Sequence, residues 1–218
     1  MIPLQFALRR RMMMAGGGGA PISELPLGTL INVGTDGGAG TPNYEIADKD
    51  NLVSGGVVLV RKNIYSKSPF GDTGGYNYID SRLDNLIKTT IYNQMPQQLR
   101  DKMMDVSFQL YKFGPITRKM FALTYTMAGF GDNQEAAEGK ALQLYTDLDS
   151  RVKLFNGSAA YWWLSSRSPA GNNWSITETG DSDSDPSYSC GVVPAFAIPS
   201  KTSYNATPNT DGSYNLIL

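Results

Sequence analysis

Three carboxylates alternate with serines in the last quarter of the chain. Asp181, Asp183 and Asp185 occupy every second position before Pro186. Calcium prefers several oxygen ligands, so this spacing is a weak candidate for a calcium site. The calcium loop of helix–loop–helix proteins also needs a glycine and a distant glutamate, and both are missing at the corresponding positions. We therefore expect a charged, solvated turn here and no metal site.

The residue types that most often do catalytic chemistry are scarce. The chain has no histidine, which removes the commonest general base and the commonest zinc ligand. Cys190 is the single cysteine, and we interpret it as a small buried apolar residue. The glycine-rich stretch 34–40 lacks the Lys-Ser/Thr ending of a phosphate loop, so it predicts a turn. A pair of carboxylates that meet in the fold, as in a glycosidase, remains an open alternative, because any two acids could meet in space. The sequence predicts a protein that is not an enzyme and needs no cofactor.

A polar segment lies between two aromatic or apolar stretches, Tyr161–Leu164 and Gly191–Phe196. If the first is a strand, Trp162 and Trp163 point to opposite faces, which predicts one core and one surface tryptophan. Aromatic rings stack on sugars or anchor interfaces, and asparagines supply adaptable hydrogen bonds. The alternative is a solvated excursion without a ligand. The candidate ligand or partner surface consists of Arg167, Asn172, Asn173, Trp174 and Tyr188.

Residues 1–20 differ in character from the rest of the chain. Apolar residues alternate from Ile2 to Leu8, which predicts an extended strand, and the glycines at 16–19 predict a hinge. Methionines suit irregular partner grooves. We expect an N-terminal arm that docks into a neighbouring subunit, and the alternative is a disordered terminus. The expected docking residues are Leu4, Phe6, Arg9, Arg10, Arg11, Met12, Met13 and Met14.

Length and charge exclude several classes of protein. The 218 residues suffice for one domain with extensions, which we place at 21–200 with a C-terminal extension or edge strand at 201–218. A net charge of −1 gives no electrostatic reason to expect nucleic acid. No apolar run approaches the ~18 residues of a transmembrane helix. The charges at 9–11 follow the first apolar patch, unlike those of a signal peptide.

Periodicity predicts an α+β protein. Strands are expected where apolar residues run together or alternate, and helices where they recur at helical spacing. The expected strands are 25–33, 44–47, 57–62, 106–111 and 120–125. The expected helices are 80–91 and 96–104, with a further short helix within 136–148.

Several blocks resemble a family of domains of unknown function that is common in phage and prophage tail gene clusters of Gram-positive bacteria. The most specific are Phe155–Leu164 (FNGSAAYWWL) and Gly191–Ser200 (GVVPAFAIPS); 9–14, 25–29 and 58–65 also resemble it. Two serines displace Arg167 from the family's usual Trp-Leu-Arg-Ser-Pro, and Val193 stands where the family usually has arginine. The segment 105–150 is also shorter than in that family.

This resemblance implies a C-type-lectin-like fold, with small mixed sheets, two packed helices and a long loop region that presents a binding face. It also implies a component of a phage virion or tail-like particle. We therefore expect a structural fibre, baseplate or decoration protein that contacts other virion proteins and assembles in the host cytoplasm. Inserted arms favour symmetric homo-oligomers, and we expect a trimer. The alternative is an adhesin that recognises a host-surface glycan or protein through the 165–190 face.

Overall fold

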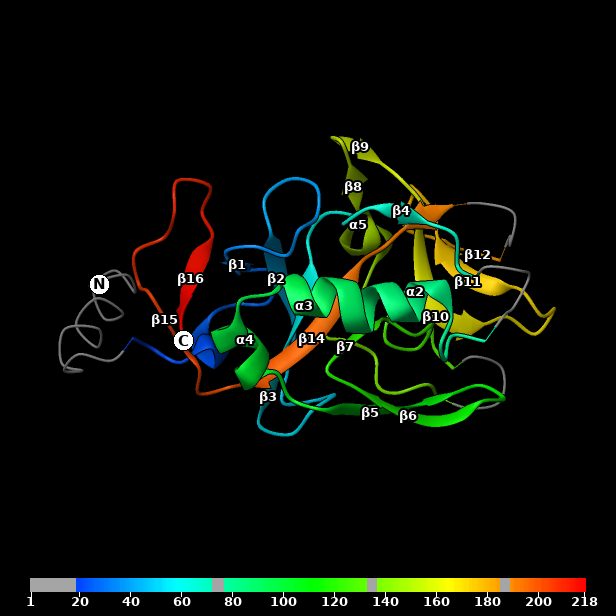
Figure 1. The fold of residues 1–218 in the computed structure, drawn as a ribbon, viewed down its shortest axis with the longest axis horizontal. Helices are drawn as coiled ribbons and strands as arrows, with labels where there is room; N and C mark the ends of the chain where they lie inside the picture. The colour runs from blue at the N-terminus through cyan, green and yellow to red at the C-terminus, as the bar shows by residue number, and fades with distance from the viewer. Residues whose placement is uncertain (1–18, 72–76, 133–136, 185–188) are drawn as a thin grey trace, which may run out of the picture.

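The computed structural model describes residues 19–71, 77–132, 137–184 and 189–218. These residues form an α+β protein built on a seven-stranded sheet in the order β15-β16-β1-β2-β3-β14-β7 (Figure 1). Its strands are β1 (Leu30–Asn32), β2 (Asn43–Lys49), β3 (Gly56–Arg61), β7 (Met120–Ala122), β14 (Pro194–Pro199), β15 (Ser203–Tyr204) and β16 (Tyr214–Ile217).

The centre of this sheet is buried on both faces. Every residue of β3 is buried, and in β14 only Pro199 is partly exposed. Such strands appear in the sequence as continuous apolar runs rather than as an alternation. β14 pairs antiparallel with β3 and β7, so a late segment of the chain lies inside the sheet. The strands expected at 44–47, 57–62 and 120–125 are therefore present as β2, β3 and β7.

A second, five-stranded sheet has the order β12-β11-β10-β13-β4. Its strands are β4 (Lys67–Ser68), β10 (Trp162–Arg167), β11 (Asn173–Ile176), β12 (Ser182–Asp183) and β13 (Cys190–Gly191). Two separate hairpins complete the strands: β5 (Val106–Leu110) with β6 (Gly114–Arg118), and β8 (Leu154–Phe155) with β9 (Ser158–Ala159). The alternating burial of β5 matches the strand expected at 106–111.

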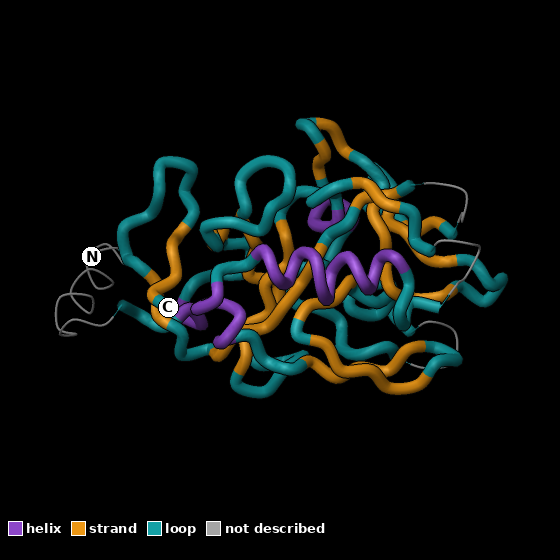
Figure 2. The backbone as a smooth tube through the Cα atoms, viewed as in Figure 1, coloured by secondary structure: helices purple, strands orange, loops and turns teal. Residues whose placement is uncertain are grey.

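One helical segment crosses the molecule in front of the large sheet (Figure 2). It consists of α2 (Arg82–Asn85), the π-helical turn η2 (Leu86–Ile91) and α3 (Tyr92–Gln94). Ser81 caps it by accepting a hydrogen bond from the backbone N–H of Asp84. The second expected helix is α4 (Gln97–Lys102), preceded by Pro96. The remaining short helices are η1 (Ile22–Glu24) and α5 (Leu148–Arg151). None of the described helices is long and apolar enough to cross a membrane.

The helix expected within 136–148 is wrong for residues 137–147. This segment is irregular and is held by contacts with distant parts of the chain. The backbone N–H of Leu142 donates to Met127, and that of Leu144 donates to Ala47. Gly139 has a φ of +100°, which a regular helix cannot contain. Similarly, only Leu30–Asn32 of the strand expected at 25–33 is a strand.

Both adjacent tryptophans are buried, which corrects the expectation of one core and one surface residue. Trp162 is 0% exposed and Trp163 is 1% exposed. The indole N–H of Trp162 donates to the carbonyl of Arg151 at 3.0 Å, and that of Trp163 donates to the carbonyl of Ser68 at 2.8 Å. Strand alternation does send the two rings to different surroundings, but β10 has protein packed on both of its faces.

The residues after 200 belong to the large sheet. β16 pairs in parallel with β1, and β15 pairs with β16 at the edge of the sheet. Gly19, the first described residue, lies against them: a Cβ at this position would be 2.2 Å from the carbonyl oxygen of Tyr204. The described chain therefore begins and ends at one end of the molecule, opposite the end that carries β11 and β12 (Figure 1).

Candidate binding surfaces

A cluster of aromatic rings lies beside β11. The ring of Tyr125 stacks on Phe130 with centroids 5.0 Å apart and contacts Trp174 at 4.7 Å. All three side chains are partly exposed. The guanidinium of Arg151 lies over the ring of Phe130, 4.2 Å from its centroid. Partly exposed, mutually supported rings present a flat apolar face that can stack against a sugar or another ring.

The residues expected on the ligand or partner surface differ in their exposure. Arg167 is partly exposed, donates from Nε to the carbonyl of Gly171 and lies 6.0 Å from the Phe113 ring centroid. Asn172 is also partly exposed, and its amide donates to the carbonyl of Ser184. Asn173 is only 2% exposed, so its expected place on the surface is wrong. In β11 its side chain points inward, while that of Trp174 points outward.

The calcium candidate is only partly described. The carboxylate of Asp181 accepts from the backbone N–H of Ser182, and that of Asp183 accepts from Ser184, both at 2.7 Å. Across the part of the chain that the structure describes, no three acidic, histidine or cysteine side chains gather as a metal site. Asp185, Tyr188 and the docking residues Leu4 to Met14 lie outside the described residues.

Two buried ion-pair clusters fasten loops to the large sheet. Arg61, with no exposed surface, donates from Nε to Asp36 at 2.6 Å, and Tyr44 donates its hydroxyl to the same carboxylate at 3.1 Å. Burial, followed by the Asp36 charge, raises the pKa of Tyr44 well above its ordinary value. In the second cluster, Glu45 pairs with the buried Lys153 at 2.5 Å.

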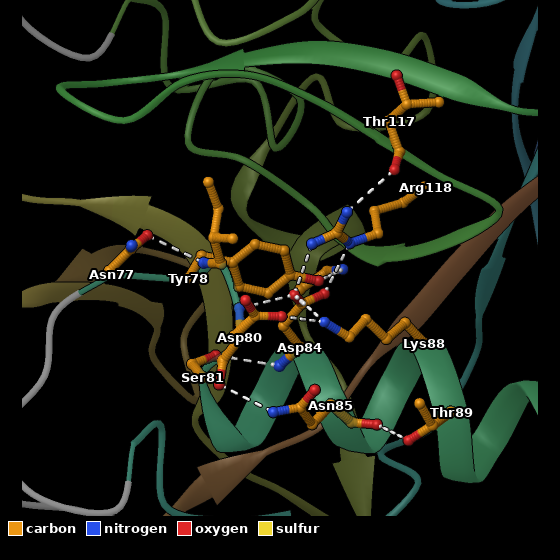
Figure 3. A network of polar contacts seen from close by, with 12 residues as sticks. Asn77, Tyr78, Asp80, Ser81, Asp84, Asn85, Lys88, Thr89, Thr117 and Arg118 are labelled. Atoms are coloured by element: carbon orange, nitrogen blue, oxygen red, sulfur yellow. Dashed lines mark hydrogen bonds and ion pairs between the residues drawn. The ribbon is translucent and has the colours of Figure 1, made fainter.

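A third cluster anchors the N-terminal half of the long helical segment (Figure 3). The buried Asp84 carboxylate accepts two hydrogen bonds from Arg118, at 2.9 and 2.7 Å, and lies 3.3 Å from the ammonium of Lys88. Lys88 also pairs with the exposed Asp80 and thereby lowers the pKa of that carboxyl group. The hydrogen bond with Asp84 raises the pKa of Arg118. These contacts tie α2 and η2 to β6.

The same helical segment lines a polar groove on another side. A hollow of about 590 Å³ lies between β4 and the segment from α2 to η2. Lys67 and Arg82 bring positive charge to it, and Asn85 brings an amide. Serine and threonine hydroxyls and the side chain of Leu86 complete the lining, which contains no carboxylate among its described residues. The remaining lining residues are Ser66, Ser68, Thr89 and Thr90.

The sequence contains a signal for this groove that apolar periodicity does not reveal. Arg82, Asn85, Leu86 and Thr89 follow the spacing i, i+3, i+4, i+7, so they share a face of the helix. Thr90, four residues after Leu86 and within the π-helical turn η2, also lines the groove. The partner strand β4 is only two residues long, and its pairing with β13 joins residues more than 120 positions apart.

Comparisons with known proteins give one positive finding. No curated protein and no solved structure matches the chain. The model of a family described as "Domain of unknown function (DUF6273)" matches residues 54–200, about two thirds of the chain. The matched region runs from the start of β3 to the end of β14 and therefore includes the second sheet and both sides of the groove. The chain belongs to the DUF6273 family of domains of unknown function.

Proposed function

We propose that this chain is a non-enzymatic structural component of a phage virion or phage-tail-like particle, such as a fibre, baseplate or decoration protein. It docks to the particle through its N-terminal arm, residues 1–20, and assembles in the host cytoplasm. We further propose that its described part is a C-type-lectin-like domain, as the blocks at 155–164 and 191–200 suggest. A sheet in which β1 and β16, from near the two ends of the described chain, pair with each other supports this proposal, as do the helices packed on that sheet and the second sheet beyond it.

The observation that carries this proposal is the placement of two surfaces at opposite ends of the molecule. At one end, Gly19 lies against β15 and β16, and two apolar side chains are exposed: Ile217 at 49% and Leu218 at 38%. The arm joins the domain at this end. At the other end lie β11 and β12 and the segments that connect them (Figure 1). A protein that attaches at one end and faces outward at the other needs this polarity.

The described charged clusters support a scaffold rather than a catalyst. Asp36, Glu45 and Asp84 are each buried and each held by a cation that comes from another segment of the chain. Their contacts fix loops and a helix in place. General acid–base catalysis would instead need such a group within reach of a substrate.

Removal of residues 1–18 tests the proposal. Because the described core is built from residues 19–218, the truncated protein should fold with an unchanged melting temperature but should no longer copurify with its particle. We expect the full chain to be a homo-oligomer, a trimer in light scattering, and the truncated chain to be smaller. Normal incorporation of the truncated chain into particles would contradict docking through the arm.

A matched pair of substitutions tests the docking end by itself. Ile217→Ser should weaken incorporation, because Ile217 is an exposed aliphatic residue beside the arm. Leu154→Ser changes a similarly exposed aliphatic residue, 38% exposed, in the β8–β9 hairpin and serves as the control. Equal effects of the two substitutions would argue against a localised docking surface.

The aromatic cluster favours a second candidate function, that of an adhesin for a host-surface glycan or protein. Trp174 is the partly exposed outer member of this cluster and lies in the expected 165–190 face. If the adhesin hypothesis is correct, Trp174→Ala should reduce binding to whole host cells by about tenfold, the loss expected for one stacked aromatic anchor. Tyr161→Ala, at a partly exposed aromatic residue just before β10, is the control. If the Trp174 variant binds host cells as well as the unmodified chain does, the adhesin hypothesis fails and only the structural role remains.

A further inference from the structure

We propose that the polar groove beside β4 receives the N-terminal arm of a neighbouring copy of this chain. Residues 2–8 of that arm add to β4 as an extra strand, the mode of binding in which an extended peptide pairs with a free sheet edge. The inference rests on the proposed docking role of the arm and names its partner, a second copy. The pairing uses the backbone of β4 and needs no charge in the groove.

The outer edge of β4 has one free pair of backbone hydrogen-bonding groups. The N–H of Val192 donates to the carbonyl of Ser66 at 2.8 Å, and Lys67 is in register with Gly191. The N–H of Gly191 donates in the other direction, to Tyr161 at 2.7 Å. Lys67 therefore occupies a non-hydrogen-bonded position of the antiparallel pair, so its own N–H and C=O point away from β13. No group of the described residues bonds to either of them.

The groove provides room along this edge. Its volume of about 590 Å³, between β4 and the segment from α2 to η2, lies within the usual range of binding sites, roughly 300–1,000 Å³. At one end its two walls are joined, because the backbone N–H of Leu83 donates to the carbonyl of Phe70 at 3.0 Å. On the helical wall, the Thr90 hydroxyl makes no hydrogen bond within the described chain, so it can bond the far side of an added strand.

The arm has the pattern of a strand that needs a partner. Apolar residues alternate from Ile2 to Leu8, as in an extended segment with one apolar face. The nearest edge of its own domain is β15, and the residue that follows the hinge already pairs there: the N–H of Tyr204 donates to the carbonyl of Ala20 at 3.1 Å. The free edge of β4 offers the arm a different partner strand.

The arm and the groove belong to different parts of the molecule. The arm leaves the domain at the β15–β16 end, whereas β4 belongs to the second sheet (Figure 1). The ten residues 9–18 join the arm strand to the domain and span at most about 35 Å when extended. A copy therefore gives its arm to one neighbour and its groove to another. Such head-to-tail contacts close into a ring when the rotation permits, which agrees with the expected trimer.

A proline at position 67 tests the inference. Proline lacks the backbone N–H, and sheets accept it at an edge where that N–H faces outward. Lys67→Pro should therefore keep the melting temperature of the full chain but weaken association by at least about tenfold in analytical ultracentrifugation, because the arm loses a backbone donor. Lys67→Ala is the matched control: it removes the side chain, keeps the N–H and should associate as the unmodified chain does.

A synthetic peptide of residues 1–11 gives a second measurement on the unmodified full chain. It should compete with the arm, dissociate the oligomer and shift the amide signals of β4 and η2 in nuclear magnetic resonance spectra. A control peptide with Gln5 and Phe6 exchanged has the same composition but a broken alternation, and it should bind at least about tenfold more weakly.

A full chain that is monomeric, an undiminished oligomer in Lys67→Pro, or peptide shifts confined to other elements would overturn the inference. None of these results contradicts the proposed function, because the arm could then dock on another virion protein. Normal incorporation of the chain without residues 1–18 would instead contradict the proposed function itself, so the two failures are distinguishable.

Discussion

Trp162→Ala and Trp163→Ala should each lower the free energy of unfolding by about 3–5 kcal/mol, the usual cost of removing a large buried aromatic side chain. Both rings are essentially unexposed, and each indole N–H has a backbone acceptor. The ring of Trp163 also packs edge-on against Phe70 with centroids 5.5 Å apart. Urea denaturation followed by circular dichroism measures the loss.

The matched control is Trp174→Ala, because Trp174 is the same residue type in a partly exposed position. Its loss should be clearly smaller than that of either buried tryptophan. If one of the β10 tryptophans costs no more than Trp174, then one face of β10 is not covered as the structure has it.

Asp36→Ala should lower the free energy of unfolding by about 3–5 kcal/mol, because it leaves a buried guanidinium without its counter-ion. Arg61 is unexposed and Asp36 is 1% exposed, and their contact is 2.6 Å. The same carboxylate also accepts from the backbone N–H of Gly38, so its loss frees the loop as well. Thermal and urea unfolding both report this change.

The double variant Asp36→Leu/Arg61→Met removes both charges at once. It should be less destabilised than Asp36→Ala, because no unpaired charge stays buried. Asp80→Ala serves as a second control: it breaks the pair with Lys88 at an exposed carboxylate and should cost much less. A double variant as unstable as the single one would assign the effect to packing rather than to charge.

Sequence periodicity predicts where several helices and strands lie along the chain. It does not predict which parts of the protein pack around them. The apolar runs at β3 and β7, the short strand at β2 and the helical stripe at 83–91 are present. The expectation of one surface tryptophan is wrong because alternation along β10 tells which way each side chain points. It does not tell whether other parts of the protein cover that face of the strand. The irregular segment 137–147 depends on partners such as Met127 and Ala47, whose proximity no local pattern contains.

The candidate sites show the same limit. Trp174 is partly exposed, as expected of a surface candidate, whereas Asn173 is buried because its face of β11 depends on the pairing with β10. The polar groove was missed altogether. Its helical half has a readable spacing from Arg82 to Thr89, but Lys67 comes from a two-residue strand that only the pairing with β13 places opposite.

We propose that the chain is a particle component attached through its N-terminal arm. A reconstruction of purified phage or tail-like particles from cells that encode the chain tests it most directly. We expect density for this domain at a fixed position, with residues 1–20 and the β15–β16 end in contact with another virion protein and the β11–β12 end facing outward. Particles that lack the chain, or that hold it by the β11–β12 end with residues 1–20 free of contacts, would contradict attachment through the arm.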